Sequence, residues 1–257
     1  MKGEVVGVNS QIYSRSGGYM GLSFAIPIDV AMEVQNQLRG GGKVSRGRLG
    51  VGIQEVTREL ADSFGMAKPR GALVASVEKD SPADRAGLQS GDVIIKYDGK
   101  DVAQSSDLPR MVGSTKPGTR MQLQVWRDGK AKDLAVAVGE MQDDKVATPR
   151  RRGHGAPDGG TPNKLGLVLG ELSAEQRKQL AVPGGVVVED MRSSGRGEFR
   201  VGDVILAVVR MGVQTEIKDV GHFNRLLAQH DSKSPLTLLV RRGEAQTFIT
   251  LKGLGDK

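Results

Sequence analysis

The stretch that most constrains this chain lies between residues 46 and 102, where turn residues and short apolar runs follow one another closely. Ser81-Pro82 can cap and begin a helical turn, and Gly87 can end that turn in a left-handed conformation. Gly91-Asp92 then leads into the apolar run Val93-Ile94-Ile95, which predicts a strand. Such a pattern favours short strands joined by tight turns and argues against a helical bundle.

Further strand and turn signals flank this stretch. Leu49-Gly50-Val51-Gly52-Ile53 predicts a strand that is entered through the basic loop Arg46-Gly47-Arg48. Farther along, Arg120–Arg127 and Lys130–Val138 predict a hairpin, because Asp128-Gly129 is a two-residue turn of the kind that joins antiparallel strands.

The C-terminal part of the chain repeats the same order of signals in a weaker form. Lys164-Leu165-Gly166-Leu167 corresponds to Arg48–Val51, and Gly202-Asp203-Val204-Ile205 corresponds to Gly91–Ile94. The Ser-Pro-Ala turn has no counterpart, since Ser193–Gly197 stands in its place. The sequence therefore predicts a second, diverged copy of the first unit.

Composition limits both the fold and the chemistry. A length of 257 residues fits two domains, and aromatic residues make up only 4%, so aliphatic side chains must build the cores. The chain has no cysteine, which excludes disulfides and thiol catalysis, and its three histidines lack the spacing of metal ligands. We therefore predict neither a metal site nor a cofactor.

The formal net charge is +7, and part of it lies in Arg150-Arg151-Arg152. These arginines belong to a Gly- and Pro-rich linker over residues 141–163, whose composition cannot bury a core. A solvated linker is favoured, and binding to an anionic polymer is the alternative. No nucleic-acid partner is predicted, because no recognition motif accompanies the charge. No apolar run is long enough for a transmembrane segment, and the N-terminus lacks the apolar core of a signal peptide.

The first forty or so residues predict a different kind of structure. Glu4–Asn9 and Gly21–Ile26 predict two strands, and a helix is expected over residues 27–38. A two-stranded hairpin with one helix is not expected to be stable alone. We therefore expect residues 3–26 to be poorly ordered or to associate with other chains through open strand edges.

Together these features closely resemble the HtrA (DegP-like) serine proteases. The Arg46–Val51 loop, the turn Ser81–Leu88 and Gly91–Ile94 follow the order of a bacterial PDZ domain of that family, and Gly21–Pro27 matches a strand that follows the catalytic serine. The resemblance implies a mainly β fold with short helices (α+β). The expected chain begins with a remnant of a trypsin-like β-barrel. Two PDZ domains follow, each a small partly open β-barrel or sandwich capped by helices.

The resemblance also implies domain boundaries and the absence of a catalytic centre. The expected segments are a protease remnant at 1–42, a first PDZ domain at 46–140, the linker at 141–163 and a diverged second PDZ domain at 164–253. The chain is thus expected to begin after the nucleophile. Ser16-Gly17-Gly18 imitates the family's nucleophile, but Arg15 stands where the family has Gly-Asn, and no histidine lies upstream. We expect no catalytic residue in this chain.

PDZ recognition adds a peptide strand beside an edge strand, and the backbone N–H groups of a loop hold the peptide's C-terminal carboxylate. Gly50 would permit the close approach of that carboxylate, the two arginines of the loop would add positive charge, and an apolar pocket would take the last side chain. The predicted peptide-binding residues are Arg46, Arg48, Leu49, Gly50, Val51, Gly52, Ile53, Leu108 and Val112. Ile53 and Leu108 fit ordinary core positions equally well.

In the second copy Lys164, Leu165, Gly166 and Leu167 are weaker candidates for the same role, and the family resemblance implies that a second PDZ domain often serves assembly. The function implied for the chain is substrate capture and regulation in a periplasmic endopeptidase of protein quality control. Its expected partners are unfolded proteins, peptide C-termini and the rest of the protease domain, with a homo-oligomer only in the full-length protein. The alternative is a free-standing tandem PDZ adaptor, against which residues 3–39 argue.

Overall fold

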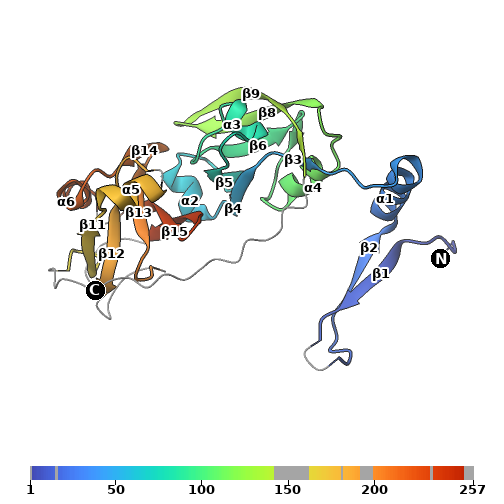
Figure 1. The fold of residues 1–257 in the computed structure, drawn as a ribbon, viewed down its shortest axis with the longest axis horizontal. Helices are drawn as coiled ribbons and strands as arrows, with labels where there is room; N and C mark the ends of the chain where they lie inside the picture. The colour runs from blue at the N-terminus through green and yellow to red at the C-terminus, as the bar shows by residue number, and fades with distance from the viewer. Residues whose placement is uncertain are drawn as a thin grey trace. The chain divides into compact units, whose positions relative to one another are not determined.

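The computed structural model describes residues 2–14, 17–141, 162–180, 182–191, 199–231 and 234–251. The predictions for Ser16, for most of the linker and for Ser193–Gly197 lie outside these residues. The chain forms two compact units, Met1–Arg46 and Gly47–Lys257. Strands and short helices make up both units (Figure 1). The mainly β fold with short helices is confirmed, and the sheets are open rather than closed into barrels.

The first unit is a hairpin followed by a helix. Strand β1 (Gly7–Ile12) pairs antiparallel with β2 (Ser23–Pro27), and α1 (Ile28–Gly41) follows directly. Gly42 ends the helix in a left-handed conformation with a φ of 69°. The predicted hairpin and helix are therefore present, with shifted ends. None of the described residues of this unit joins a buried apolar core, and Val6 is 84% exposed.

The second unit contains two antiparallel sheets of the same topology. The first has the strand order β4-β5-β6-β8-β9, with β7 beside β6. Its strands are β4 (Val51–Glu55), β5 (Ala72–Val77), β6 (Val93–Tyr97), β7 (Lys100–Asp101), β8 (Arg120–Arg127) and β9 (Lys130–Ala137). The hairpin predicted across Asp128-Gly129 is confirmed, and both turn residues have the positive φ that such a turn requires.

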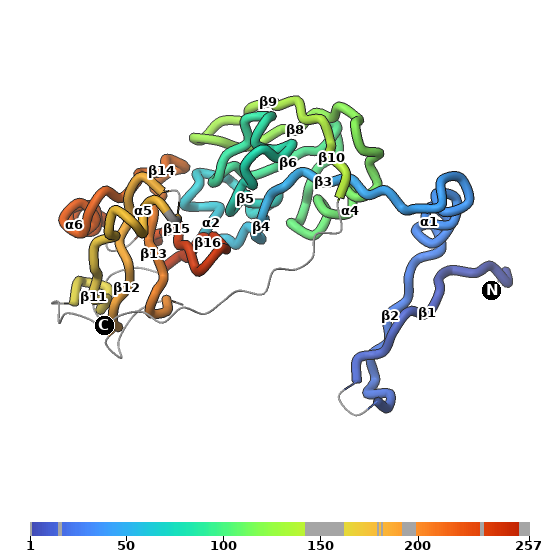
Figure 2. The backbone as a smooth tube through the Cα atoms, viewed as in Figure 1, coloured from blue at the N-terminus to red at the C-terminus, as the bar shows by residue number. Residues whose placement is uncertain are grey.

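The strand predicted over residues 49–53 begins later than expected. Gly50 has a φ of 77°, which interrupts the extended conformation between β3 (Gly47–Arg48) and β4. Strand β3 pairs instead with β10 (Gly139–Glu140), and Figure 2 shows these two short strands side by side. The left-handed glycine thus turns the entry of the sheet into a loop.

Three short helices accompany the first sheet: α2 (Arg58–Ser63), α3 (Pro82–Arg85) and α4 (Asp107–Gly113). The predicted cap of α3 is confirmed, because the Ser81 hydroxyl accepts a hydrogen bond from the Asp84 N–H at 3.2 Å. Gly87 follows with a φ of 77°, as a left-handed helix end requires.

The second sheet has the strand order β11-β12-β13-β15-β16, with β14 beside β13. The two helices that accompany it are α5 (Ala174–Leu180) and α6 (Val220–Ala228). Its strands are β11 (Leu167–Glu171), β12 (Val186–Met191), β13 (Val204–Arg210), β14 (Val213–Glu216), β15 (Leu236–Arg242) and β16 (Ala245–Leu251). Strand for strand, this order repeats that of the first sheet.

The aspartate of each Gly-Asp-Val-Ile motif is almost fully buried and forms an ion pair with an arginine. Asp92 is 1% exposed and binds Arg127 at 2.6 Å, and Asp203 is 1% exposed and binds Arg242 at 2.7 Å. Each arginine is the last residue of its strand, so each pair ties the start of one strand to the end of its neighbour. The hydrogen bond that Arg127 donates to Asp92 raises the pKa of Arg127, which therefore remains charged.

The two sheets of the second unit also share an apolar cluster. Ile95 of β6 and Phe64 belong to the same cluster as Leu239 of β15 and Phe248 of β16. The rings of Phe64 and Phe248 meet edge to face, with 5.5 Å between their centroids. The amide of Gln54 in β4 also exchanges two hydrogen bonds of 2.9 Å with the backbone of Phe248. The two copies therefore pack as one compact unit.

Candidate functional site

The candidate site begins at the loop between β3 and β4. Gly50 is required there for two structural reasons, because its φ is positive and its backbone lies close to Ser81. A Cβ atom at Gly50 would lie only 2.4 Å from the Ser81 Cβ atom. The Ser-Pro-Ala turn and the loop thus fit together only if this residue is glycine.

The hydrogen bonds of this loop use its carbonyl groups. The Leu49 carbonyl accepts a bond of 2.9 Å from the Ala83 N–H, and the Gly50 carbonyl accepts one of 2.9 Å from the Glu78 N–H. Among the residues that the structure describes, the N–H groups of Leu49 and Gly50 donate no backbone hydrogen bond. The loop is therefore fixed through its acceptors and retains two unused donors.

The positive charge beside the loop is partly matched within the protein. Arg48 forms an ion pair with Glu78 at 2.6 Å, and the two side chains are 33% and 54% exposed. Arg46 is exposed and is the last residue of the first unit. Exposed ion pairs contribute little to stability, so Arg48 mainly neutralises the carboxylate of Glu78 next to the loop.

The apolar residues predicted for the site come together in one cluster. Leu49, Leu108 and Val112 are buried in that cluster, and the half-buried Val51 and Ile53 pack against it. Leu108 is 2% exposed, so it is a core residue, whereas the half-buried members of the cluster form an apolar wall at its surface. Gly52 lies on β4 beside Ser76 of β5, where it contributes backbone alone.

One residue of this wall was missing from the predicted set. Met111 of α4 is half-buried and packs against the same cluster. The signal was present in the sequence, because Leu108, Met111 and Val112 follow the spacing of one helix face. Strand β4 is also an edge strand, paired with β5 on one side only. An edge strand beside an apolar wall can accept a further strand.

The corresponding loop of the second sheet has a similar shape but different hydrogen bonds. Gly166 has a φ of 74°, Leu165 and Leu167 are buried, and Lys164 is exposed. The side-chain oxygen of Asn163 accepts bonds from the N–H groups of Leu165 at 2.9 Å and Leu167 at 3.2 Å. The Gly166 N–H binds the Asn163 carbonyl at 2.9 Å. All three donors of this loop are therefore occupied.

Neither a metal-binding cluster nor a membrane-spanning helix occurs among the described residues. No group of three or more histidine and acidic side chains in this part of the chain could hold a metal ion. Among the same residues, no helix is both long enough and apolar enough to cross a membrane.

Comparison with known proteins agrees with this geometry. The PDZ domain family matches residues 47–138. The chain is 44% identical over 254 residues to a probable periplasmic serine endoprotease DegP-like from Pseudomonas putida, and 47% identical over 254 residues to one from Pseudomonas savastanoi. In both cases the match covers 98% of this chain and 52% of the relative, so the chain spans about half the length of these proteins.

A solved structure is similar as well. The HtrA-type protease AlgW with a tripeptide superimposes with a TM-score of 0.50 at 38% sequence identity, over 55% of this chain and 47% of that protein. The sequence matches, the PDZ match and the structural match all indicate one family. Over 98% of its length the chain is similar to the HtrA-type, DegP-like serine proteases, and its residues 47–138 match the PDZ domain family.

Proposed function

We propose that the loop at Leu49-Gly50 binds the C-terminal carboxylate of a peptide whose backbone adds as a strand along the free edge of β4. The observation that carries this proposal is the pair of unused N–H groups at Leu49 and Gly50, in a loop whose carbonyls are already bonded. Hydrogen bonds to an ionised acceptor are stronger than neutral ones, so these donors favour a carboxylate.

The apolar wall determines which side chain precedes that carboxylate. Leu108 and Val112 are almost fully buried, so the half-buried Val51, Ile53 and Met111 offer the surface that a peptide side chain would contact. These three side chains are all apolar. The peptide is therefore expected to end in an apolar residue.

The test compares two peptides that differ only at the C-terminus. Calorimetry with a peptide ending in an apolar residue should give a micromolar dissociation constant, which corresponds to about −8 kcal/mol. Amidation of the same peptide removes the charge that the loop donors meet, so binding should weaken by about 1.5–3 kcal/mol. Equal binding of the two peptides would contradict carboxylate capture and leave the edge of β4 as the only feature of the groove.

For the complete protein, we propose a periplasmic endopeptidase of protein quality control in which this chain supplies substrate capture and regulation. The names of the relatives, probable periplasmic serine endoproteases, support the periplasmic location and the endopeptidase activity in this proposal. In this proposal residues 1–42 belong to the protease domain, the catalytic triad lies outside this chain, and residues 164–253 are a second PDZ domain. The exposed apolar side chains of the first unit support this assignment, because the remainder of a protease domain would cover them.

The proposal gives the chain itself a binding role and no proteolytic activity. Unfolded proteins and peptide C-termini are its proposed partners, and a homo-oligomer is expected only for the complete protein. A free-standing tandem PDZ adaptor would have no use for the first unit, whose apolar side chains would remain in water. The family assignment and this exposed unit together favour the protease fragment.

A further inference from the structure

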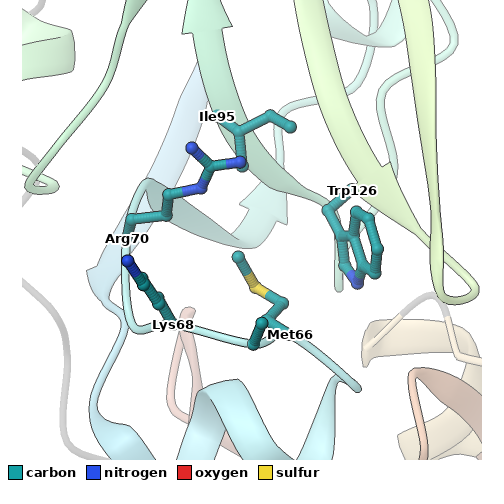
Figure 3. A pocket seen from close by; sticks show the side chains of 6 residues that line it. Met66, Lys68, Arg70, Ile95 and Trp126 are labelled. Atoms are coloured by element: carbon teal, nitrogen blue, oxygen red, sulfur yellow. The ribbon is translucent and has the colours of Figure 1, made fainter.

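A cavity lies on the face of the first sheet opposite the candidate groove. Ile94 and Ile95 are neighbours in β6, so their side chains point to opposite faces of the sheet. Ile94 belongs to the apolar cluster that carries the groove, whereas Ile95 lines the cavity. The cavity has a volume of about 290 Å³ and is lined by Met66, Ala67, Lys68, Arg70, Ile95 and Trp126 (Figure 3).

The floor of this cavity is apolar, and a hydrogen bond fixes its one aromatic ring. Met66 is 8% exposed and Ile95 is 3% exposed, and the ring of Trp126 is half-buried. The indole N–H of Trp126 donates a hydrogen bond of 2.9 Å to the Phe64 carbonyl, which fixes the ring and leaves its carbon atoms for contact. A thioether and an indole ring both favour an aromatic partner.

The rim of the cavity is positively charged. Lys68 and Arg70 are exposed, and no hydrogen bond or ion pair to either side chain occurs in the part of the chain that the structure describes. In Figure 3 these two cations lie on one side of Met66 and Trp126 lies on the other. No acidic residue lines the cavity, so its charge is not neutralised from within.

We propose that this cavity binds an aromatic side chain flanked by acidic residues within an unfolded polypeptide. Its volume is near the lower limit of small-molecule pockets, which is about 300 Å³, and therefore suits one large side chain. The apolar floor would take the ring, and Lys68 and Arg70 would meet the neighbouring carboxylates. Such a segment needs no free C-terminus, so this site is independent of the loop at Leu49-Gly50.

The position of the cavity has a consequence for binding strength. The cavity and the proposed peptide groove lie on opposite faces of one sheet, so two segments of one unfolded polypeptide could occupy both. Binding of a second segment of the same chain is then intramolecular, which raises the overall affinity without any new contact. The proposed ligand is therefore an unfolded polypeptide with an acidic, aromatic segment upstream of an apolar C-terminus.

The natural reporter for this site is Trp126, since the chain contains only one tryptophan. The probe is a short peptide with the central sequence Glu-Phe-Asp, acetylated and amidated so that it cannot use the carboxylate loop. Titration of this peptide into the full chain should change the fluorescence emission of Trp126 until the signal saturates. Replacing its acids with Gln and Asn should weaken binding by about three- to tenfold, because exposed charge pairs contribute modestly.

Two double variants with the same charge change distinguish binding at the cavity from general electrostatic attraction. The double variant K68Q/R70Q should weaken binding of the blocked peptide by about three- to tenfold. The matched control K100Q/K132Q removes the same charge from exposed positions of the first sheet that do not line the cavity, and should leave binding unchanged. Neither double variant should alter binding of a peptide with a free apolar C-terminus, which tests the carboxylate loop separately.

Three results would overturn this inference. The first is a blocked peptide that leaves Trp126 emission and calorimetric heat unchanged. The second is equal weakening by K68Q/R70Q and K100Q/K132Q. The third is full displacement of the blocked peptide by the peptide with a free C-terminus, because both peptides would then occupy the groove.

Discussion

The two loops that open the sheets of the second unit have the same backbone shape and opposite hydrogen-bonding states. Gly50 and Gly166 have φ angles of 77° and 74°. In the first loop the carbonyls are bonded and two N–H groups are unused, whereas in the second Asn163 occupies the N–H groups. The first loop can therefore receive an anion, and the second is a closed turn.

One sequence position accounts for this difference. Gly47 precedes Arg48-Leu49-Gly50, and Asn163 precedes Lys164-Leu165-Gly166. A Cβ atom at Gly47 would lie 2.2 Å from the Val112 carbonyl oxygen, so no side chain fits there. The first loop thus cannot acquire the asparagine that closes the second. A shared fold fixes the shape of the loop, and one residue decides whether its donors are available.

The largest expected effect concerns what the two copies share, the buried ion pairs. Asp92→Asn removes the charge that compensates Arg127, which is only 15% exposed, so the free energy of unfolding should fall by about 3–5 kcal/mol. Asp203→Asn should have a smaller effect, because Arg242 is 34% exposed and remains hydrated. Urea denaturation of the two variants measures both values. Equal losses would show that exposure of the arginine does not matter.

The next prediction concerns the shape that both loops have. Gly50→Ala places a methyl group against Ser81 and forces an unfavourable φ, so it should lower the free energy of unfolding by about 2–4 kcal/mol. The matched control is Gly87→Ala, because Gly87 has the same φ of 77° and a Cβ atom added there would meet no atom within 4 Å. It should lose only about 1–2 kcal/mol. If the two losses were equal, contact with Ser81 would not constrain the loop.

Much of the fold could be predicted from the sequence because its signals are local. The Asp128-Gly129 hairpin, the Ser81 cap and the left-handed Gly87 depend on neighbouring residues, and the structure confirms all three. The apolar residues predicted for the site do lie in one cluster, and Met111, which was left out, could also have been found from its helix spacing. What a single stretch could not reveal was that Gly50 is needed for contact with Ser81, because that contact joins two distant turns.

Pairings between residues far apart in the chain could not be predicted from the sequence, because local signals do not show which distant residues meet. The bonds of Asp92 with Arg127 span 35 positions, and those of Gln54 with Phe248 span 194. No spacing rule connects such residues, so the shared cluster of the two sheets was not anticipated. The role of Asn163 was local and could have been found, since asparagine readily binds backbone N–H groups two residues farther on.

The third prediction concerns the loop of the second sheet, whose N–H groups are occupied. Asn163→Gly removes the acceptor that binds the N–H groups of Leu165 and Leu167, at a loss of about 1–2 kcal/mol of stability. The freed donors should create a second, weaker binding event for a peptide with a free apolar C-terminus, measured by calorimetry. Asn163→Asp keeps the acceptor oxygen and should not create it. A stable Asn163→Gly protein without the second event would show that other differences also close this loop.

The smallest effect is expected at Arg48, which stands at the open loop only. The pair with Glu78 is exposed, so Arg48→Ala should change the free energy of unfolding by less than about 1 kcal/mol. Its effect on peptide binding should be clearer, because it leaves the Glu78 carboxylate beside the loop that we propose binds another carboxylate. The double variant Arg48→Ala, Glu78→Ala removes both charges and should bind the peptide more tightly than Arg48→Ala alone. If the second substitution gave no recovery, Arg48 would act on the peptide directly rather than by neutralising Glu78.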